Sequence, residues 1–313
     1  MTEETTKDTR NVRVLRLFGA CSTEVRQAAQ ALPQKWALTV QCRSRGGETL
    51  VALQANGPEA LEKGERSLRA CFPDALYGVG GQSLAAAAVQ TLEQHKRLLV
   101  CADAAAGALA EARLEAVEGA DKVFDFGTMS YAHPRTGPKI EAQAARRASR
   151  EDTLGQEGAK VQAAQKLVGA ELSAGCVEQQ NCVTLLLGTK KGCWVRTVLL
   201  QDNPGLWLLD MVRRAAAGLK QAEGTHWYRW RDKLPAEELL PEIPADQAPA
   251  SDAAPPAEKS SRPRRHPLRW LLLLLLLALA VFAAAWFYTG GDLSSLPGRL
   301  GWENTPHTGA SLL

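Results

Sequence analysis

The side chains that could carry chemistry are scattered along this 313-residue chain rather than grouped in a known pattern. The sequence contains no phosphate-binding loop, dinucleotide-binding glycine turn, serine nucleophile elbow or zinc-protease helix. Its seven cysteines form no CxxC pair and its five histidines no cluster. We therefore expect neither a metal, a cofactor nor a disulfide framework. Cys101 is a candidate nucleophile, although the apolar run that it ends favours a buried core residue.

The elements that would position these residues fall into two segments, and helices interleaved with strands indicate an α/β (layered α+β) class. In residues 11–81, Ser22 is the expected N-cap of the first helix. We expect strands at 12–18, 36–42 and 49–55 and helices at 23–32 and 58–71 there. In residues 82–221 we expect helices at 83–95, 104–116, 141–150, 157–168 and 204–220, and strands at 97–102, 123–131, 183–187 and 193–200.

The most apolar segment begins at Trp270, ends at Gly291 and carries no charge. At 1.5 Å per residue it would extend about 30 Å, which matches the hydrocarbon thickness of a bilayer. We therefore predict a single transmembrane helix at 270–291 that contacts the lipid bilayer. Five basic residues precede it (Lys259, Arg262, Arg264, Arg265 and Arg269), whereas only Arg299 follows it. The positive-inside rule then places the preceding domains in the cytoplasm and the short tail, residues 292–313, outside.

The rest of the chain completes this predicted topology. Residues 1–11 are polar and lack the apolar core of a signal peptide. Residues 222–269 are predicted to be a disordered, proline-rich linker that is first acidic and then basic. Within it, the aromatic and basic residues 225–231 could touch lipid headgroups or a partner, or could close the preceding domain. The formal net charge of only +3 gives no reason to expect a nucleic acid partner.

Three stretches of sequence carry a family resemblance. L-A-A-A-A-V at residues 84–89, R-L-L-V-C-A at 97–102 and V-F-D-F-G-T-M-S-Y at 123–131 together resemble the C-terminal domain of the CinA (competence/damage-inducible protein) family. Members of that family are nicotinamide-mononucleotide amidohydrolases. Residues 15–81 are similar to the KH-like domain that precedes it, whereas the molybdopterin-binding-like domain that begins full-length CinA has no counterpart. The resemblance implies a KH-like α+β sandwich at 11–81, a CinA C-terminal-like domain at 82–221 and a homo-oligomer. Together with the predicted transmembrane helix, it gives a bacterial cell membrane as the expected location.

The resemblance also implies where a site would lie, and most of its reactive positions have changed. The family's nucleophile motif A-E-S-C-T-G-G falls on residues 102–108, where Ala104 takes the place of the serine and Gly107 keeps a glycine. Tyr131 matches the family's tyrosine, whereas the activating lysine falls on Thr136, with Lys139 three residues late. The glycine-rich substrate loop aligns with residues 174–178 and keeps only Gly175.

These changes predict a catalytically inactive, membrane-anchored relative of the amidohydrolases. Alanine cannot attack an amide carbon, so we expect a binding, scaffolding or regulatory role with a nicotinamide nucleotide as the implied ligand. One alternative is an active nicotinamide-mononucleotide amidohydrolase in pyridine-nucleotide salvage, whose rearranged site uses Tyr131 and Lys139. Another is RNA binding by the KH-like segment, but residues 22–55 lack the GxxG loop that clamps phosphates. Nucleic acid is therefore disfavoured.

Overall fold

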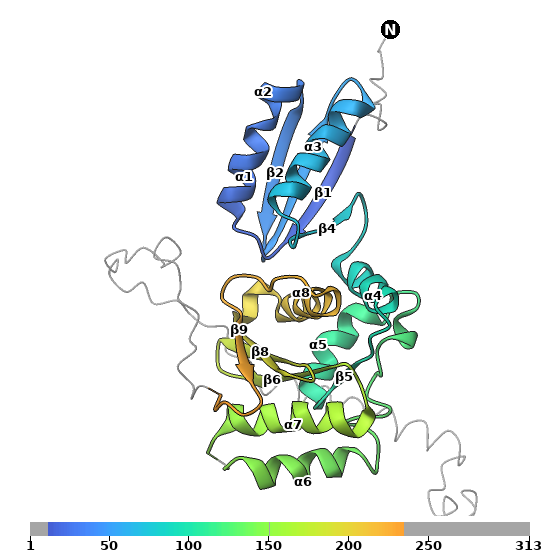
Figure 1. Cartoon of the computed structure of the whole chain (residues 1–313), viewed down its shortest axis with the longest axis vertical. Helices are drawn as coiled ribbons and strands as arrows, with labels where there is room; N and C mark the ends of the chain where they lie inside the picture. Colours follow the sequence, from blue (N-terminus) through green and yellow to red (C-terminus); the bar gives the residue numbers. More distant parts are fainter. Residues whose placement is uncertain (1–11, 150, 235–313) are drawn as a thin grey trace, which may run out of the picture. The chain divides into compact units, whose positions relative to one another are not determined.

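The computed structural model describes residues 12–149 and 151–234, which all lie within Met1–Ala245, one of the two units of the chain. They form a mixed α/β structure with two sheets, as the sequence predicts (Figure 1). The linker beyond residue 234, the predicted transmembrane helix at 270–291 and the tail at 292–313 lie outside the described residues. Among the helices that the structure describes, none is both long and apolar enough to cross a membrane.

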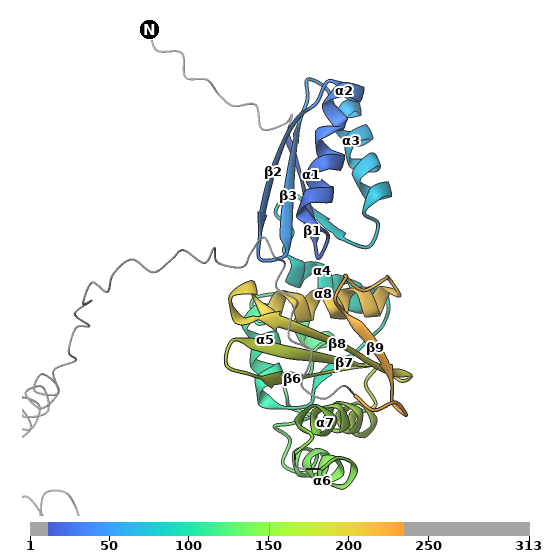
Figure 2. The same ribbon diagram turned by 90° about the vertical axis from the view of Figure 1, so that its left-hand side faces the viewer.

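The first sheet has four antiparallel strands in the order β2-β3-β1-β4. Its strands are β1 (Val12–Phe18), β2 (Thr39–Arg45), β3 (Glu48–Gln54) and β4 (Leu76–Val79). Alternate residues of β1 and β3 are buried, because one face of the sheet packs on helices while the other faces outward (Figure 2). Those helices are α1 (Ser22–Gln30), α2 (Leu32–Trp36) and α3 (Pro58–Cys71).

Two details of this sheet differ from the sequence prediction. Ser22 is the first residue of α1, and Cys21 holds the N-cap position without a side-chain hydrogen bond. The helix therefore begins one residue earlier than expected and lacks a side-chain cap. Residues 76–79, for which the sequence analysis expects no strand, form β4 and pair antiparallel with β1.

The second sheet has five strands in the order β5-β6-β7-β8-β9, of which only β5 and β6 run parallel. The strands are β5 (Leu99–Cys101), β6 (Leu172–Glu178), β7 (Cys182–Gly188), β8 (Gly192–Leu199) and β9 (His226–Arg229). In Figure 1, α5 (Ala104–Leu114) and α8 (Pro204–Ala217) cover one face, with α4 (Leu84–Gln94) against α8. The other face is covered by α7 (Thr153–Val168), and α6 (Gly137–Arg147) packs on α7.

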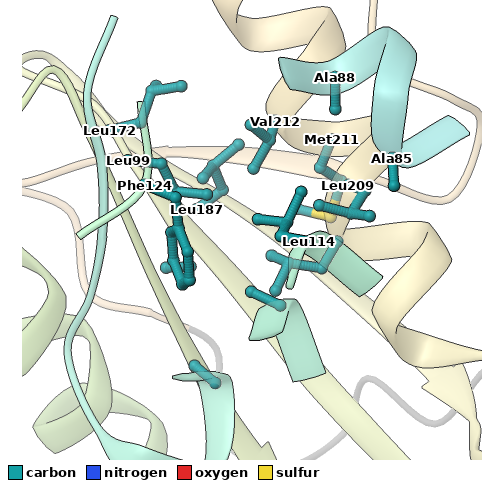
Figure 3. Packing of buried hydrophobic residues seen from close by; sticks show 14 of the residues in the cluster. Ala85, Ala88, Leu99, Leu114, Phe124, Leu172, Leu187, Leu209, Met211 and Val212 are labelled. Atoms are coloured by element: carbon teal, nitrogen blue, oxygen red, sulfur yellow. The ribbon is translucent and has the colours of Figure 1, made fainter. Parts of the chain in front are cut away.

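The main core lies between the second sheet and the first of these helix layers. Leu99 and Leu187 from the sheet meet Leu114 from α5 and Val212 from α8, as Figure 3 shows. Each fully buried leucine or valine side chain stabilises the fold by about 1.5–3 kcal/mol relative to an exposed one. This packing fixes where β5 ends and α5 begins, which is where the sequence places the candidate site.

The predicted strand at 123–131 is wrong. A 3-10 helix (Ala120–Lys122) is followed by a single bridge from Phe124 to Leu99 and then by turns. Buried Asp125 holds those turns, accepting hydrogen bonds from the Thr128 hydroxyl at 3.1 Å and the Met129 amide at 2.7 Å. An Asp that satisfies its carboxylate locally competes with the hydrogen-bond ladder of a strand, which the residue pattern alone does not reveal.

Two strands of the second sheet were not predicted. β6 lies in the sheet interior and carries small residues, so the pattern there is weak. β9 lies inside residues 222–269, the segment predicted as linker, and pairs with β8 so that Trp227 faces Trp194 with ring centroids 4.7 Å apart. The aromatic and basic segment at 225–231 therefore adds an edge strand to the sheet. Trp227 keeps 37% of its surface exposed there.

Helix α8 also contacts the first sheet through two buried arginines. Arg213 donates to the Asp74 carbonyl at 2.6 Å and Arg214 donates to the Phe18 carbonyl at 2.7 Å. Both guanidinium groups pair with the carboxylate of Asp210 at 2.7 Å, one on each oxygen. A single carboxylate on α8 thus orients two side chains that satisfy backbone carbonyls at the end of β1 and before β4.

Candidate functional site

The candidate site lies at the carboxyl end of the parallel strands β5 and β6, an edge where α/β sheets commonly bind ligands. The chain leaves β5 at Cys101, and the Ala102 amide donates to the Ala174 carbonyl of β6 at 2.7 Å. Asp103 then caps α5, its Oδ1 accepting from the Ala106 amide at 2.9 Å. Cap and strand together fix the direction in which the first turn of α5 presents its amides.

Ala104 is the first residue of α5 and is exposed at this edge. The amides of Ala104 and Ala105 belong to the first helical turn, whose N–H groups have no helical carbonyl to bond. Such amides, at the positive end of the helix dipole, suit an anionic or carbonyl oxygen. The position predicted to have lost its nucleophile therefore offers hydrogen-bond donors and a methyl group, and no hydroxyl.

Tyr131 lies against α5, and its hydroxyl is committed to another residue. A Cβ added to Gly107 would sit 2.4 Å from the Tyr131 oxygen, so the ring occupies the space that the glycine leaves. The hydroxyl donates to Glu111 Oε1 at 2.8 Å, two turns along α5 from Ala104. Burial, together with this hydrogen bond to Glu111, raises the pKa of Tyr131 well above its ordinary value. Tyr131 therefore stays protonated and is a poor general base.

Thr136, at the aligned lysine position, and Lys139, the suggested substitute, make other contacts or none among the described residues. Thr136 binds the ring of His133, with both its amide and its hydroxyl 3.2 Å from Nδ1. Lys139 is exposed on α6. Among the described residues, no hydrogen bond or ion pair joins Lys139 to Ala104 or Tyr131. The structure thus brings Tyr131 and Gly107 together, and among the described residues it shows no polar contact that joins Lys139 to them.

Gly175 lies in strand β6 rather than in the loop that the alignment implies, which corrects that expectation. A Cβ at Gly175 would lie 2.3 Å from Glu157 Oε1 and 2.5 Å from Val161 Cγ2, both on α7. The glycine is therefore required because a carboxyl group from α7 packs directly on the strand.

Glu157 is the residue of this site that the sequence prediction missed. It is only 6% exposed, and burial followed by a hydrogen bond with Asp103 raises its pKa to about 9. Lys160 Nζ lies 3.7 Å from Glu157 Oε2 and 3.0 Å from Glu141 Oε1. Glu157 follows Leu154 by three residues and precedes Val161 by four, so it lies on the apolar face of α7. A charged residue at that spacing was the signal in the sequence that could have identified it.

The thiols near this edge are buried and unreactive. Cys101 has no exposed surface, and burial, followed by the charge of Asp103, raises its pKa well above the ordinary value. Cys176 on β6 is buried as well, and the same two causes raise its pKa. Neither thiol is a nucleophile in this state, and Cys101 belongs to the core between the sheet and α5.

Other features that could hold a ligand lie elsewhere. Within residues 12–149 and 151–234, no group of three His, Cys, Asp or Glu side chains is arranged to bind a metal ion. A cavity of 500 Å³ beside Trp36 and one of 360 Å³ beside Lys96 are lined by residues that take no part in the candidate site.

Comparison with known proteins gives one recurring result. The chain is 28% identical over 212 residues to a CinA-like protein of Desulfovibrio desulfuricans, a match that covers 60% of this chain and 49% of the relative. It is 32% identical over 127 residues to a CinA-like protein of Akkermansia muciniphila, covering 40% of this chain and 30% of the relative.

A third relative is a competence-damage inducible protein of Thermoanaerobacter sp. strain X514, 26% identical over 134 residues, which cover 41% of this chain and 32% of the relative. The matched segments thus span between about a third and a half of the curated relatives. No family model matches the chain.

Proposed function

We propose that this chain, a relative of the CinA family by its sequence, is a membrane-anchored member that binds a nicotinamide nucleotide without hydrolysing it and acts in regulation or scaffolding. The resemblance supplies the nucleotide, and the run at 270–291 supplies the anchor. The geometry of the candidate site supports the loss of hydrolysis.

Ala104 is the observation that carries the proposal. It stands at the first position of α5, exposed at the edge where a ligand would meet the free amides of the helix. Hydrolysis through an acyl-enzyme needs a nucleophile there, and a methyl group cannot form the covalent bond. Removing the serine of a serine protease lowers kcat by about 10⁶-fold, so what is left is binding.

The nearby groups do not favour a rearranged active site. The Tyr131 hydroxyl donates to Glu111, which holds the proton that a general base would need to give up. Lys139 is exposed on α6, and the buried Cys101 thiol is part of the core. Because no observation favours the active amidohydrolase, that activity serves as the outcome that would overturn the proposal.

The experiment measures binding and turnover on the same sample. The full-length protein, purified in detergent, is titrated with nicotinamide mononucleotide by calorimetry while released ammonia is assayed, with an active CinA-family amidohydrolase as positive control. We expect heat of binding and no ammonia. Ammonia released at the rate of the control enzyme would overturn the inactivity, and absence of heat would overturn the binding role.

A pair of variants tests whether the nucleotide binds at the first turn of α5. Ala104→Arg puts a long side chain across the exposed first turn of α5, and we expect it to weaken binding at least tenfold, about 1.4 kcal/mol. Ala145→Arg makes the same change at an exposed position of α6 and should leave the affinity unchanged. Equal affinities for the two variants would show that the nucleotide binds elsewhere.

A further inference from the structure

Two buried carboxyl oxygens at the candidate site have no hydrogen-bond donor as a partner among the described residues. They are Asp103 Oδ2 and Glu157 Oε1, which are both shielded from solvent. An ionised carboxylate buried without a partner is strongly destabilising, so a native structure keeps one only when something compensates it. The two oxygens belong to carboxyl groups that influence each other, since Asp103 is among the causes that raise the pKa of Glu157.

The position of the pair links three elements. Glu157 projects from α7 onto β6, where only the missing side chain of Gly175 makes room for it. Asp103 follows β5, and its Oδ1 caps α5 through the Ala106 amide while its Oδ2 is buried without a hydrogen-bond partner. Any change in the bond between the two carboxyl groups therefore acts on the residue that sets the first turn of α5.

A single proton on one of the two carboxyl groups would give both unpaired oxygens a hydrogen-bond partner. Two ionised carboxylates have only acceptors and repel each other, whereas a carboxylic acid donates to a carboxylate and leaves a single negative charge. The acid is Glu157, because it is the more deeply buried of the two. Asp103 keeps the charge, which the helix N-terminus stabilises.

Among the described groups around Glu157, Lys160 balances a negative charge on its carboxyl group only in part. Lys160 on α7 stands 3.7 Å from the outer oxygen, and it shares its charge with Glu141 on α6 at the shorter distance of 3.0 Å. Cys176 on β6 and Cys193 on β8 are neutral thiols whose pKa burial raises. The inner oxygen of Glu157 thus faces no positive charge among the described residues.

We propose that Asp103 and Glu157 share one proton, and that this proton positions the first turn of α5, so that ligand binding at Ala104 depends on the pair staying protonated. Glu157 is then a positioning residue that acts through Asp103 and does not touch the ligand. The dependence of ligand binding rests on the proposed function, whereas the shared proton does not.

Loss of the proton has a defined consequence. Hydroxide or a buffer base takes the proton from the Glu157 O–H, and the electron pair stays on the oxygen as a second negative charge. The two carboxylates then repel, and Asp103 is the more exposed and moves more easily. Because Asp103 Oδ1 caps α5, its movement removes one bond from the first turn.

The first test observes the proton directly in the full-length protein. Infrared spectra recorded from about pH 5 to pH 10 report whether a protonated carboxyl group is present and where it is lost. We expect a carboxylic acid signal at neutral pH that disappears near pH 9 and is absent from Glu157→Gln. The matched control, Glu141→Gln, removes the exposed partner of Lys160 and should keep the signal. A fully ionised pair at neutral pH would overturn the proposal.

The second test follows the same proton in stability and binding. The pKa of Glu157 is higher in the folded state than in the unfolded chain, so its contribution to stability is lost as pH rises towards 9. The unfolding constant of the wild type should rise by at most about tenfold per pH unit from this group, and Glu157→Gln should remove that dependence. Glu157→Gln should bind nicotinamide mononucleotide as the wild type does at neutral pH, and better at alkaline pH.

The two tests separate the inference from the proposed function. If the carboxyl group titrates near pH 9 but no variant binds the nucleotide, the shared proton is supported and the binding role is overturned. Nucleotide binding with the same pH profile in the wild type and Glu157→Gln overturns the positioning role. Glu157→Gln is expected to fold, because Gln keeps the shape and the hydrogen-bond donor of the protonated acid.

Discussion

Gly107 and Gly175 each make room for a side chain from another element. Tyr131 rests on Gly107 of α5, and Glu157 rests on Gly175 of β6. Neither glycine has a positive φ, so the reason for both is close approach rather than backbone conformation. At this site, each glycine is therefore explained by the side chain that packs against it. No role in binding a substrate is needed to explain it.

The first prediction tests this packing at Gly107. In an ordinary helix, Gly→Ala stabilises by about 1 kcal/mol. Here the new methyl group would meet the Tyr131 oxygen at 2.4 Å, so we expect Gly107→Ala to lower the free energy of unfolding by about 1–3 kcal/mol, measured by urea denaturation. The loss comes from forcing the Tyr131 ring away and breaking its bond to Glu111.

Two variants control this prediction. Gly81→Ala adds a methyl group where no atom lies within 4 Å and should change stability by less than about 0.5 kcal/mol. In a Tyr131→Ala background, the penalty of Gly107→Ala should vanish because the obstructing ring is gone. A penalty that persists there would mean that the glycine is needed for some other reason.

At the scale of elements, α8 depends on one buried carboxylate. Asp210 is 1% exposed and holds both Arg213 and Arg214, which in turn bind the carbonyls of Asp74 and Phe18. Removing the shared acid would leave two cations buried without a counter-charge. This arrangement is destabilised far more by loss of the acid than a surface ion pair would be.

We therefore expect Asp210→Ala to lower the free energy of unfolding by about 3–5 kcal/mol. Glu59→Ala is the matched control, because Glu59 is 88% exposed and lies 3.8 Å from Lys63, so its loss should change the stability by less than about 1 kcal/mol. Thermal or urea unfolding of both variants measures the difference. Similar small effects for both would show that the arginines find other partners.

The apolar pattern predicted β1, β3 and α4, and it failed at two places for different physical reasons. β1, β3 and α4 follow their apolar patterns. The segment after Phe124 turns because Asp125 bonds its own neighbours, which overrides an apolar pattern that favoured a strand. β6 was missed because its small residues, buried on both faces, show no alternation.

The candidate site follows the same division. The sequence predicted a strand at 97–102 followed by a helix at 104–116, and the family resemblance indicated the lost serine, because Ala104 can be read directly from the aligned motif. It missed Glu157, because the effect of that residue depends on Asp103, which lies on another element. Two carboxyl groups far apart in the sequence leave no pattern in it that predicts their proximity, so only the folded structure reveals the pair.

At the scale of the whole molecule, the proposed role joins a small-molecule site to a bilayer. Hydrolysis of a soluble small molecule does not require the enzyme to be at a membrane. A protein that signals ligand binding to a membrane partner must stay at the membrane. The described fold ends just after β9, and 35 residues separate position 234 from the apolar run at 270–291.

The last prediction concerns this anchor. When the full-length protein is expressed in bacterial cells, we expect it to sediment with the membranes, resist extraction by salt or alkaline carbonate, and dissolve in detergent, because burying an apolar run of bilayer length outweighs any surface electrostatic attraction. A chain that stops at Arg269 keeps every basic residue of the flank and serves as the control. It should be released by salt, since screening removes the attraction between basic residues and anionic lipid. Salt release of the full-length protein as well would show that the basic flank, rather than residues 270–291, holds the protein at the membrane.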